Sequence, residues 1–321
     1  MSDRAAVIAK FLAGTGFEHW QQVSLAGDAS TRSYLRLVQG DEAIILMDAT
    51  PSGAKSTETF VQIADWLSAT GLAAPKILKG ETNAGLLLLE DLGQTDFADH
   101  LRNHPPDTTD LYAAATDVLI HLHQAKPPDS LTVMTPEVGG QMLDVTLEWY
   151  AEQSNDQSLI HAMTSHLAAL CEPATDIALR DYHAENLIWR PDLTGLAKVG
   201  LLDFQDAFLA PRGYDLVSLL RDVRREVSPD ICAKMTGRFA DATGELTPGA
   251  FSCLAVQRNL RILGVFARLA RRDGKHRYMQ MIPHLWSLIT ADLAHPALAD
   301  LKRITDTCLP PPEHSAIKDL L

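Results

Sequence analysis

The sequence predicts an α+β fold of two lobes, in which a small antiparallel sheet precedes a mostly helical region that contains a hairpin. The sheet is predicted by short runs of branched and apolar residues, separated by small polar turns, at about 22–25, 33–38 and 43–48. The helical region is predicted by apolar residues that recur at helical spacing over 110–122, 142–153, 159–170, 251–270 and 281–294. Two short apolar runs on either side of a turn with Pro and Gly predict the hairpin, at 187–189 and 199–202.

Further elements are predicted around the sheet. The spacing of Val7, Ile8, Phe11 and Leu12 predicts an amphipathic helix over 3–14. The sequence then indicates three more elements: a helix over 56–69, an extended segment after Pro75 and a buried strand over 86–89. Because E-D-L-G follows this strand at once, we place the lobe boundary there, with an N-lobe of 1–92 and a C-lobe of 93–321.

The most informative stretch surrounds the hairpin. Asp181 and Asn186 lie five apart in a loop that leads into the first hairpin strand, and Asp203 directly follows the second. Oxygen-bearing side chains in this pattern are suited to bind Mg²⁺ beside a triphosphate and to accept the proton of an attacking hydroxyl. R-D-x-x-x-x-N followed by D-F also matches the catalytic and metal loops of protein kinases. Asp and Asn are common in ordinary turns, but two such motifs in order, each at a strand end, favour the catalytic interpretation.

Charge and composition argue against several classes of function. The net charge of −13 disfavours a nucleic-acid-binding surface and docking on anionic lipid. The apolar runs are too short to cross a bilayer, and the first residues lack the apolar core of a signal peptide. The four cysteines are scattered without metal-binding spacing, which indicates reduced thiols. We therefore expect a cytoplasmic protein with no membrane or nucleic-acid partner, and no protein partner is evident from the sequence.

The motifs, taken in order, resemble a known family. The strand that ends in L-L-L-L-E-D-L-G, then L-R-D-Y-H-A-E-N, L-L-D-F-Q and G-Y-D-L, are similar to the aminoglycoside phosphotransferase / choline kinase branch of the protein-kinase-like fold, over roughly 20–295. Within that branch, G-D-A-S-T-R-S-Y-L-R-L and L-R-D-Y-H-A-E-N-L-I-W resemble the bacterial N-acetylmuramate/N-acetylglucosamine anomeric kinases. The resemblance, and not the composition, implies an ATP- and Mg²⁺-dependent kinase that phosphorylates the C1 hydroxyl of an amino sugar in peptidoglycan recycling.

The resemblance also implies roles for individual residues. Asp181 would be the catalytic base, and Asn186 and Asp203 would be the Mg²⁺ ligands. The nucleotide would lie against a polar turn and against backbone groups of the lobe connector, at Gly27, Asp28, Ala29, Ser30, Glu90 and Leu92. Asp215, at the start of a helix, is interpreted as a structural residue that braces the catalytic loop.

The sequence departs from the family pattern at two places. The catalytic loop begins with L-R-D instead of H-G-D. The third strand, which normally carries a lysine for the α and β phosphates, has I-L-M-D at 45–48. Either another cation takes this role or phosphate binding is weaker. Arg32 and Arg36 on the preceding strand are the nearest candidates, and we favour Arg32.

The substrate contacts are less strongly indicated. Since N-acetylmuramate carries a lactyl carboxylate, a cation in the sugar pocket is chemically reasonable, and Arg258 and Arg261 are the candidates. The pattern of their helix places the arginines outside the apolar stripe, which favours the alternative that they face solvent or pair with acidic residues. Gln205 is a further candidate for contacting the sugar.

Other functions stay open at this point. One is a kinase of the same fold that acts on another alcohol, such as an aminoglycoside or an amino alcohol. A cationic substrate of this kind would favour an acidic pocket, and the arginine-rich helix argues mildly against it. The absent lysine suggests a nucleotide-binding pseudokinase, but the joint presence of Asp181, Asn186 and Asp203 argues for an enzyme. A protein kinase lacks support because no A-P-E segment follows D-F-Q.

Overall fold

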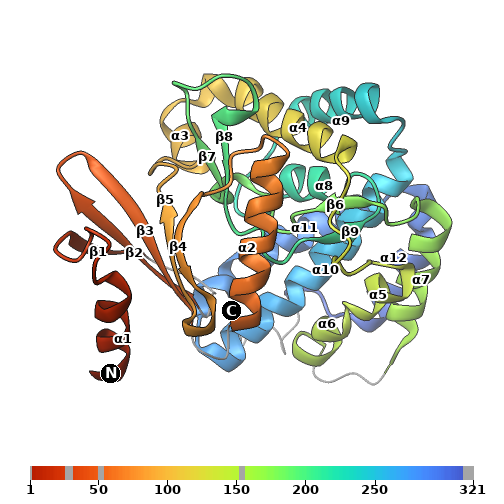
Figure 1. Cartoon of the computed structure of the whole chain (residues 1–321). Coiled ribbons are helices and arrows are strands. Elements are labelled where there is room, and N and C mark those ends of the chain that lie inside the picture. Colours follow the sequence, from red (N-terminus) through yellow and green to blue (C-terminus); the bar gives the residue numbers. More distant parts are fainter. Residues whose placement is uncertain (1, 26–31, 50–53, 152–155, 314–321) are drawn as a thin grey trace. The chain divides into compact units, whose positions relative to one another are not determined.

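The computed structural model describes residues 2–25, 32–49, 54–151 and 156–313, and its backbone divides into two compact units (Figure 1). Unit 1 comprises Met1–Ala114 and Glu185–Asp206, and unit 2 comprises Ala115–Ala184 and Ala207–Leu321. The hairpin thus belongs to unit 1, whereas the loop before it belongs to unit 2. The lobe boundary at residue 92 stays a prediction.

Unit 1 is built on a five-stranded antiparallel sheet with the strand order β1-β2-β3-β5-β4. Its strands are β1 (Gln21–Leu25), β2 (Arg32–Gln39), β3 (Glu42–Ala49), β4 (Ile77–Glu81) and β5 (Leu86–Glu90). The strands expected from the sequence are confirmed to within about two residues. The extended segment after Pro75 becomes the edge strand β4.

The two faces of this sheet have different neighbours. Apolar side chains of α1 (Ser2–Leu12), β2, β3 and β5 form a core on one face, with Phe11, Leu12, Leu35, Leu37, Ile44, Leu46, Leu86 and Leu88. Because side chains alternate along a strand, the even-numbered residues of β2 occupy the other face. The helix α2 (Ala54–Ala69) lies on the opposite side of the sheet from α1 (Figure 1).

The hairpin is tied into unit 1 by its backbone. Its strands β7 (Leu187–Trp189) and β8 (Val199–Leu201) pair in antiparallel register, between the 3-10 turns η4 (Ala184–Asn186) and η5 (Gly195–Lys198). The Leu201 N–H donates to the Ala73 carbonyl at 2.8 Å, and the Trp189 N–H donates to the Thr95 carbonyl at 2.9 Å. The short helix α3 (Phe97–Asn103) follows Thr95. These bonds fix where each hairpin strand ends.

Unit 2 is mostly helical and contains one small strand pair, β6 (Asp176–Ala178) with β9 (Phe208–Ala210). The helix α4 (Thr108–Gln124) leads into it from unit 1. Its other helices are α5 (Pro136–Gln141), α6 (Asp144–Trp149), α7 (Ser158–Leu170), α8 (Tyr214–Leu220), α9 (Pro229–Thr243), α10 (Pro248–Asp273), α11 (Ile282–Leu293) and α12 (Ala299–Cys308).

The helices expected over 110–122, 159–170, 251–270 and 281–294 are confirmed as α4, α7, α10 and α11. The helix expected over 142–153 is wrong in extent, because α6 ends at Trp149 and a separate helix α5 precedes it. The Thr135 side chain accepts a hydrogen bond from Val138 N at 3.3 Å and so begins α5 before the expected start.

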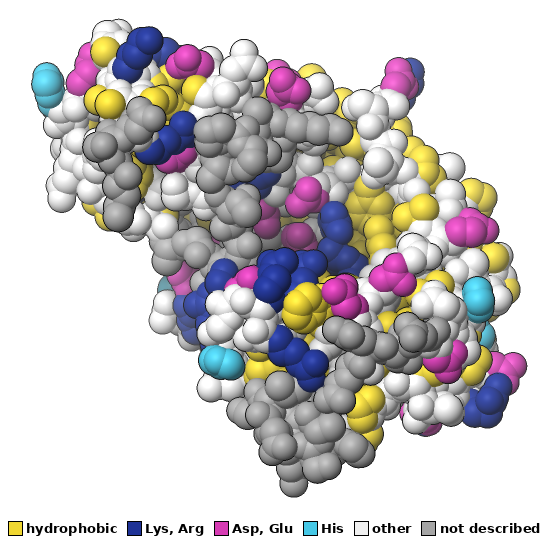
Figure 2. Space-filling model, turned by 90° about the horizontal axis from the view of Figure 1, so that it is seen from below, with side chains coloured by type: hydrophobic (Ala, Val, Ile, Leu, Met, Phe, Trp, Pro, Cys, Tyr) yellow, Lys and Arg dark blue, Asp and Glu magenta, His cyan; other side chains and the backbone are white. Residues whose placement is uncertain are grey.

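The four cysteines are free thiols, as expected. Within the described ranges, no helix is both long enough and apolar enough to span a membrane. On the face shown in Figure 2, Lys and Arg side chains lie among Asp and Glu side chains.

The helices α6 and α10 cross at close range in unit 2. A Cβ added at Gly264 of α10 would lie 2.4 Å from the Thr146 N and 2.5 Å from the Val145 carbonyl carbon. Beside this crossing, the buried Thr146 hydroxyl donates to the Leu260 carbonyl at 2.7 Å. Only glycine at position 264 allows this backbone approach.

We expect Gly264→Ala to lower the free energy of unfolding by about 1–3 kcal/mol, because the new methyl group meets backbone that cannot rotate away. Gly237→Ala is the matched control, since a Cβ there meets nothing within 4 Å in the helix α9. That control should gain roughly 0.5–1 kcal/mol from helix propensity. Urea unfolding of both variants measures the two changes, and equal effects would contradict the close crossing.

Candidate active site

In unit 2, the catalytic loop is held by the carboxylate of Asp215. The Leu179 N–H donates to Oδ2 of Asp215, and the Arg180 N–H donates to Oδ1 at 3.0 Å. Arg180 has a positive φ of 78°, which is uncommon for a residue with a side chain. The two hydrogen bonds from these backbone amides therefore stabilise an unfavourable backbone conformation directly before Asp181. This contact agrees with the bracing role expected for Asp215.

The environment of Asp215 is almost dry. Burial raises the pKa of its carboxyl group to about 7, although the hydrogen bonds from Leu179 and Arg180 and the charge of Arg258 act in the opposite direction. The charge of Asp181 raises the pKa further. Asp215 is only 4% exposed, so the loop rests on a carboxylate that ionises at a substantial desolvation cost.

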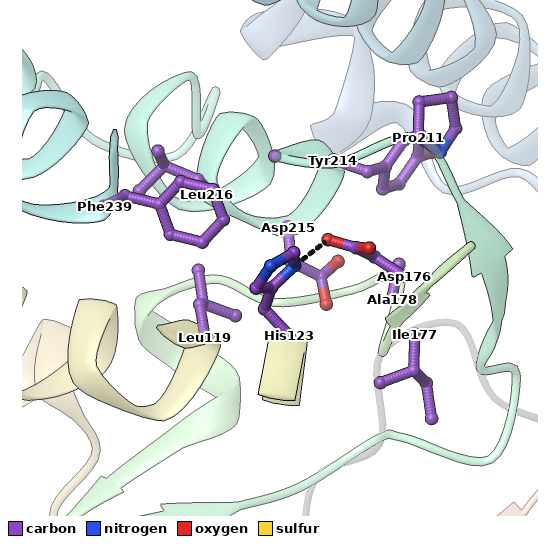
Figure 3. A pocket seen from close by; sticks show the side chains of 11 residues that line it. Leu119, His123, Asp176, Ile177, Ala178, Pro211, Tyr214, Asp215, Leu216 and Phe239 are labelled. Atoms are coloured by element: carbon purple, nitrogen blue, oxygen red, sulfur yellow. Dashed lines mark hydrogen bonds and ion pairs between the residues drawn. The ribbon is translucent and has the colours of Figure 1, made fainter. Parts of the chain in front are cut away.

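A small cavity of about 20 Å³ lies beside Asp215 in unit 2 (Figure 3). Across it, the His123 ring points toward Asp176, and Nδ1 lies 2.7 Å from Oδ2. Apolar side chains such as Phe239 and Leu216 complete the wall. The cavity has room for about one water molecule, so it is too small to be the pocket for a sugar or a nucleotide.

Three arginines share the environment of Asp181. Burial raises the pKa of the Tyr214 phenol, the charges of Arg261, Arg258 and Arg180 act in the opposite direction, and the charge of Asp181 raises it further. Burial also lowers the pKa of Arg261, and the like charges of Arg180 and Arg258 lower it further. The three guanidinium groups, Asp181 and Tyr214 therefore lie within electrostatic reach of one another.

The burial of Arg258 shows that the alternative of a solvent-facing side chain is wrong for this residue. Arg258 is 3% exposed and does not face solvent, and Arg261 is half-buried. The apolar stripe did not predict this burial, because α10 is buried on nearly all sides between Gly249 and Leu260. On such a helix, a position outside the stripe is still inside the protein.

In unit 1, the hairpin brings Asn186 and Asp203 together. Leu187 is paired with Leu201, and the Leu202 N–H donates to the Asn186 carbonyl at 3.0 Å. Asn186 therefore lies across from Leu202 and adjacent to Asp203. The predicted metal ligands occupy neighbouring strand ends, as the spacing of the motifs suggested.

The residues after β8 hold Asp203 in a defined position. Asp203 is exposed and has a positive φ of 56°. Phe204 is fully buried against Phe60 of α2, with a ring distance of 4.9 Å. The Gln205 side chain donates to Oδ1 of Asp203 at 2.8 Å. Gln205 thus orients the Asp203 carboxylate, a contact that the sequence did not reveal.

The face of the sheet opposite α1 carries Arg32, Tyr34 and Arg36. Burial raises the pKa of Tyr34, the charge of Arg32 and its hydrogen bond to the phenol act in the opposite direction, and the charge of Asp203 raises the pKa. Arg32 and Asp203 therefore lie near the same phenol. Tyr34 was not predicted, but its even register with Arg32 on β2 was a usable signal.

The other arginine candidate is already engaged. The Arg36 guanidinium donates to Oδ1 of Asp91 at 2.8 Å and to the Gly93 carbonyl at 3.3 Å. On β3, Asp48 lies on the α1 side of the sheet and accepts a hydrogen bond from Arg4 Nε at 2.9 Å. Arg32 thus stays the candidate for the role of the absent lysine.

The connector after β5 has mixed suitability for binding a nucleotide. The Glu90 N–H donates to the Lys76 carbonyl at 2.8 Å, so this N–H is already used inside the protein. Among the backbone bonds of the described residues, none uses the N–H or the carbonyl of Leu92. The polar turn predicted to cover the phosphates, Gly27, Asp28, Ala29 and Ser30, lies outside the described residues.

The donor set at the hairpin fits a hard divalent cation. In the part of the chain that the structure describes, no three His, Cys, Asp or Glu side chains come together as a metal cluster. Asn186 and Asp203 supply oxygen atoms only, in an accessible position. Mg²⁺ usually takes one or two such protein ligands and completes its shell with phosphate oxygens and water.

A sequence model described as the phosphotransferase enzyme family matches residues 21–247 of this chain. An N-acetylmuramate/N-acetylglucosamine kinase of Caulobacter vibrioides is 38% identical to it, over 96% of this chain and 98% of the relative. A kinase of the same name from Pseudomonas aeruginosa is 30% identical, over 87% of this chain and 86% of the relative.

Solved structures show the same fold at low sequence identity. Choline kinase LicA from Streptococcus pneumoniae superposes with a TM-score of 0.66 at 14% identity, over 89% of this chain and 99% of the other. A spectinomycin phosphotransferase in complex with ADP and spectinomycin gives a TM-score of 0.63 at 12% identity, over 90% and 98% of the two chains. The kinase-like α+β fold expected from the sequence is confirmed.

The pKa of Asp215 predicts how stability depends on pH. The pKa is about 7 in the folded protein and 3.8 in a model compound, so ionisation favours unfolding between these values. As the pH rises from 5 to 8, we expect wild type to lose about 2–3 kcal/mol of unfolding free energy relative to Asp215→Asn. Urea unfolding of both proteins over this range measures the difference between their unfolding free energies. A difference that does not change with pH would contradict the raised pKa of Asp215.

Proposed function

We propose that this chain, which belongs to the phosphotransferase enzyme family, uses ATP to phosphorylate the anomeric C1 hydroxyl of N-acetylmuramate, N-acetylglucosamine or both. Family membership was expected from the sequence and is confirmed by the match over 21–247. The amino sugar is proposed from the names of relatives that cover most of the chain. The observation that carries the chemistry is the pair of held loops, one with Asp181 and one with Asn186 and Asp203.

In the proposed mechanism, Asp181 is the catalytic base. It orients the C1 hydroxyl toward the γ-phosphorus and takes the proton as the oxygen attacks. An anomeric hydroxyl is more acidic than other sugar hydroxyls, so a carboxylate suffices as the base. The Asp215 clamp on Leu179 and Arg180 supports this role because it fixes the backbone before Asp181.

Asn186 and Asp203 would hold Mg²⁺, which when bound offsets the negative charge of the phosphates. Gln205 restrains the Asp203 carboxylate through its 2.8 Å hydrogen bond and so acts as a positioning residue here, while a direct sugar contact stays a prediction. Arg32 would supply the cation for the phosphates, and backbone groups of Leu92 and Glu90 would bind adenine. The half-buried Tyr34 phenol, hydrogen-bonded to Arg32, would keep that guanidinium in place.

The arginines near Asp181 favour an anionic sugar. Arg258 is buried, and Arg261 and Arg180 add like charge close to it. Asp181 and Asp215 offset part of this positive charge, and burying several guanidinium groups together is costly unless anions compensate all of them. The lactyl carboxylate of N-acetylmuramate would provide this compensation, whereas a cationic aminoglycoside or amino alcohol would add to the repulsion.

The function is tested by coupled ADP release with N-acetylmuramate, N-acetylglucosamine, an aminoglycoside and choline as acceptors. We expect turnover with one or both amino sugars and none with the cationic alcohols. Turnover with a cationic alcohol alone would reject the proposed substrate but not the reaction class. ATP binding without turnover on any acceptor would support a pseudokinase instead.

We expect Asp181→Asn to lower kcat on the order of 10²–10⁴-fold, because the amide cannot accept the proton. ADP binding, measured by isothermal titration calorimetry, should change little. Asp206→Asn, which alters an exposed carboxylate outside the proposed machinery, is the control. Near wild-type turnover of Asp181→Asn would remove Asp181 from the mechanism.

For Arg258→Ala, we expect kcat/KM for N-acetylmuramate to fall about 10–100-fold, the range for a lost hydrogen bond to a charged group. The value for N-acetylglucosamine, which lacks the lactyl carboxylate, should change far less. Arg261→Ala provides a second, half-buried test, and the exposed Arg272→Ala on the same helix is the control. Equal losses on both sugars would reject the arginines as lactyl contacts.

A further inference from the structure

A buried ion pair joins β2 to the connector that follows β5 in unit 1. The side chains of Arg36 and Asp91 are 10% and 9% exposed. Arg36 Nε lies 2.6 Å from Oδ2 of Asp91, and the second guanidinium nitrogen donates to Oδ1 at 2.8 Å. The second of these contacts is a hydrogen bond, and the first is a close approach of opposite charges.

The register of the sheet explains how this pair forms. Arg36 is paired with Ile45 of β3, and Ile45 is paired with Leu89 of β5. The three side chains form one row across the sheet, and Asp91 follows Leu89 by two residues. Arg36 therefore reaches over β3 to the connector on the face that α1 does not cover. This is also the face of Arg32 and Tyr34.

The pair fixes the connector on both sides of Leu92. Asp91 Oδ1 accepts a hydrogen bond from the Gly93 N–H at 2.9 Å, and Arg36 donates to the Gly93 carbonyl at 3.3 Å. Gly93 has a φ of 124°, a conformation that residues with a side chain rarely adopt. The peptide groups around Leu92 are thus set by one guanidinium and one carboxylate.

Leu92 is anchored from the other side as well. Its side chain is 7% exposed and packs against β8, where a Cβ on Gly200 would lie 3.0 Å from Leu92 Cδ1. No backbone bond among the described residues uses the Leu92 N–H or carbonyl. These two groups are therefore held in place and available to a ligand.

We infer that Arg36 is a positioning residue for nucleotide binding, which presets the Leu92 backbone groups for the edge of a purine base. This inference rests on the proposed function, because it takes the connector as the base-binding segment. The two arginines on this face of β2 then have separate tasks: Arg32 serves the phosphates and Arg36 serves the base. They are four residues apart, or roughly 13 Å along the strand.

A purely stabilising role for the pair makes a different prediction. Removing one partner of a buried ion pair leaves an uncompensated charge, which destabilises the protein whatever the pair does. Replacing both partners by uncharged groups of similar size often restores stability. Stability and nucleotide affinity therefore separate in the double variant Arg36→Met/Asp91→Asn. In this variant, the residue 91 carboxamide can still accept from the Gly93 N–H.

The experiment measures ADP affinity by isothermal titration calorimetry and stability by urea unfolding in the same proteins. We expect Arg36→Met and the double variant to bind ADP about tenfold more weakly than wild type. Stability should recover in the double variant. Arg36→Lys should lose less affinity, because an ammonium group can replace one of the two hydrogen bonds, to Asp91 or to the Gly93 carbonyl, but is not shaped to make both. At saturating ATP, kcat and the KM for the sugar should stay within about twofold of wild type.

The matched control is Arg221→Met. Arg221 forms two hydrogen bonds with Asp292 in unit 2, at 2.9 and 3.1 Å, so its loss tests the effect of breaking a largely buried ion pair as such. ADP affinity that recovers together with stability in the double variant, or falls equally in Arg221→Met, would overturn the inference alone. Wild-type protein that does not bind ADP would overturn the proposed function and the inference with it.

Discussion

The buried carboxylate of Asp215 is the interaction on which the catalytic loop depends. A residue held in the left-handed region, such as Arg180 at φ 78°, costs on the order of 1–3 kcal/mol. Hydrogen bonds to a charged group contribute about 1.5–3 kcal/mol each, so the amides of Leu179 and Arg180 offset this strain. The carboxylate itself is stabilised only weakly in its charged form, which its raised pKa of about 7 reflects. The loop shape is thus maintained by a balance of opposing terms around one side chain.

In unit 1, the third strand β3 carries no lysine, whereas its neighbour β2 carries two arginines. Because side chains alternate along a strand, Arg32, Tyr34 and Arg36 lie on the face that α1 does not cover. Arg32 shares the environment of Asp203, and Arg36 is committed to the connector at Asp91.

The sequence predicted what is local and left open what depends on packing. Strands and helices followed from alternation and helical spacing, and Asn186 lies next to Asp203 because the hairpin spacing enforces it. The helix expected over 142–153 extends beyond the end of α6. Two short helices that begin at the Thr135 cap show little periodicity in their apolar residues, so the sequence did not predict where they end. The sequence pattern favoured a solvent-facing Arg258 because it placed this residue outside the apolar stripe. The helix α10 is buried on nearly all sides there, so a position outside the stripe is still buried. The Arg36–Asp91 pair is 55 residues apart in the chain, so no local pattern could reveal it.

The central claim is that Asp181 directs the C1 hydroxyl of an amino sugar toward the γ-phosphate. The most direct test compares N-acetylmuramate with its 1-O-methyl glycoside, in which this one hydroxyl is blocked, by phosphorus NMR and ADP release. The account predicts a sugar 1-phosphate, identified by coupling of its phosphorus to the anomeric proton, and no turnover of the glycoside. Phosphorylation of the glycoside at a rate similar to that of the free sugar would place the reaction at another hydroxyl and contradict the account.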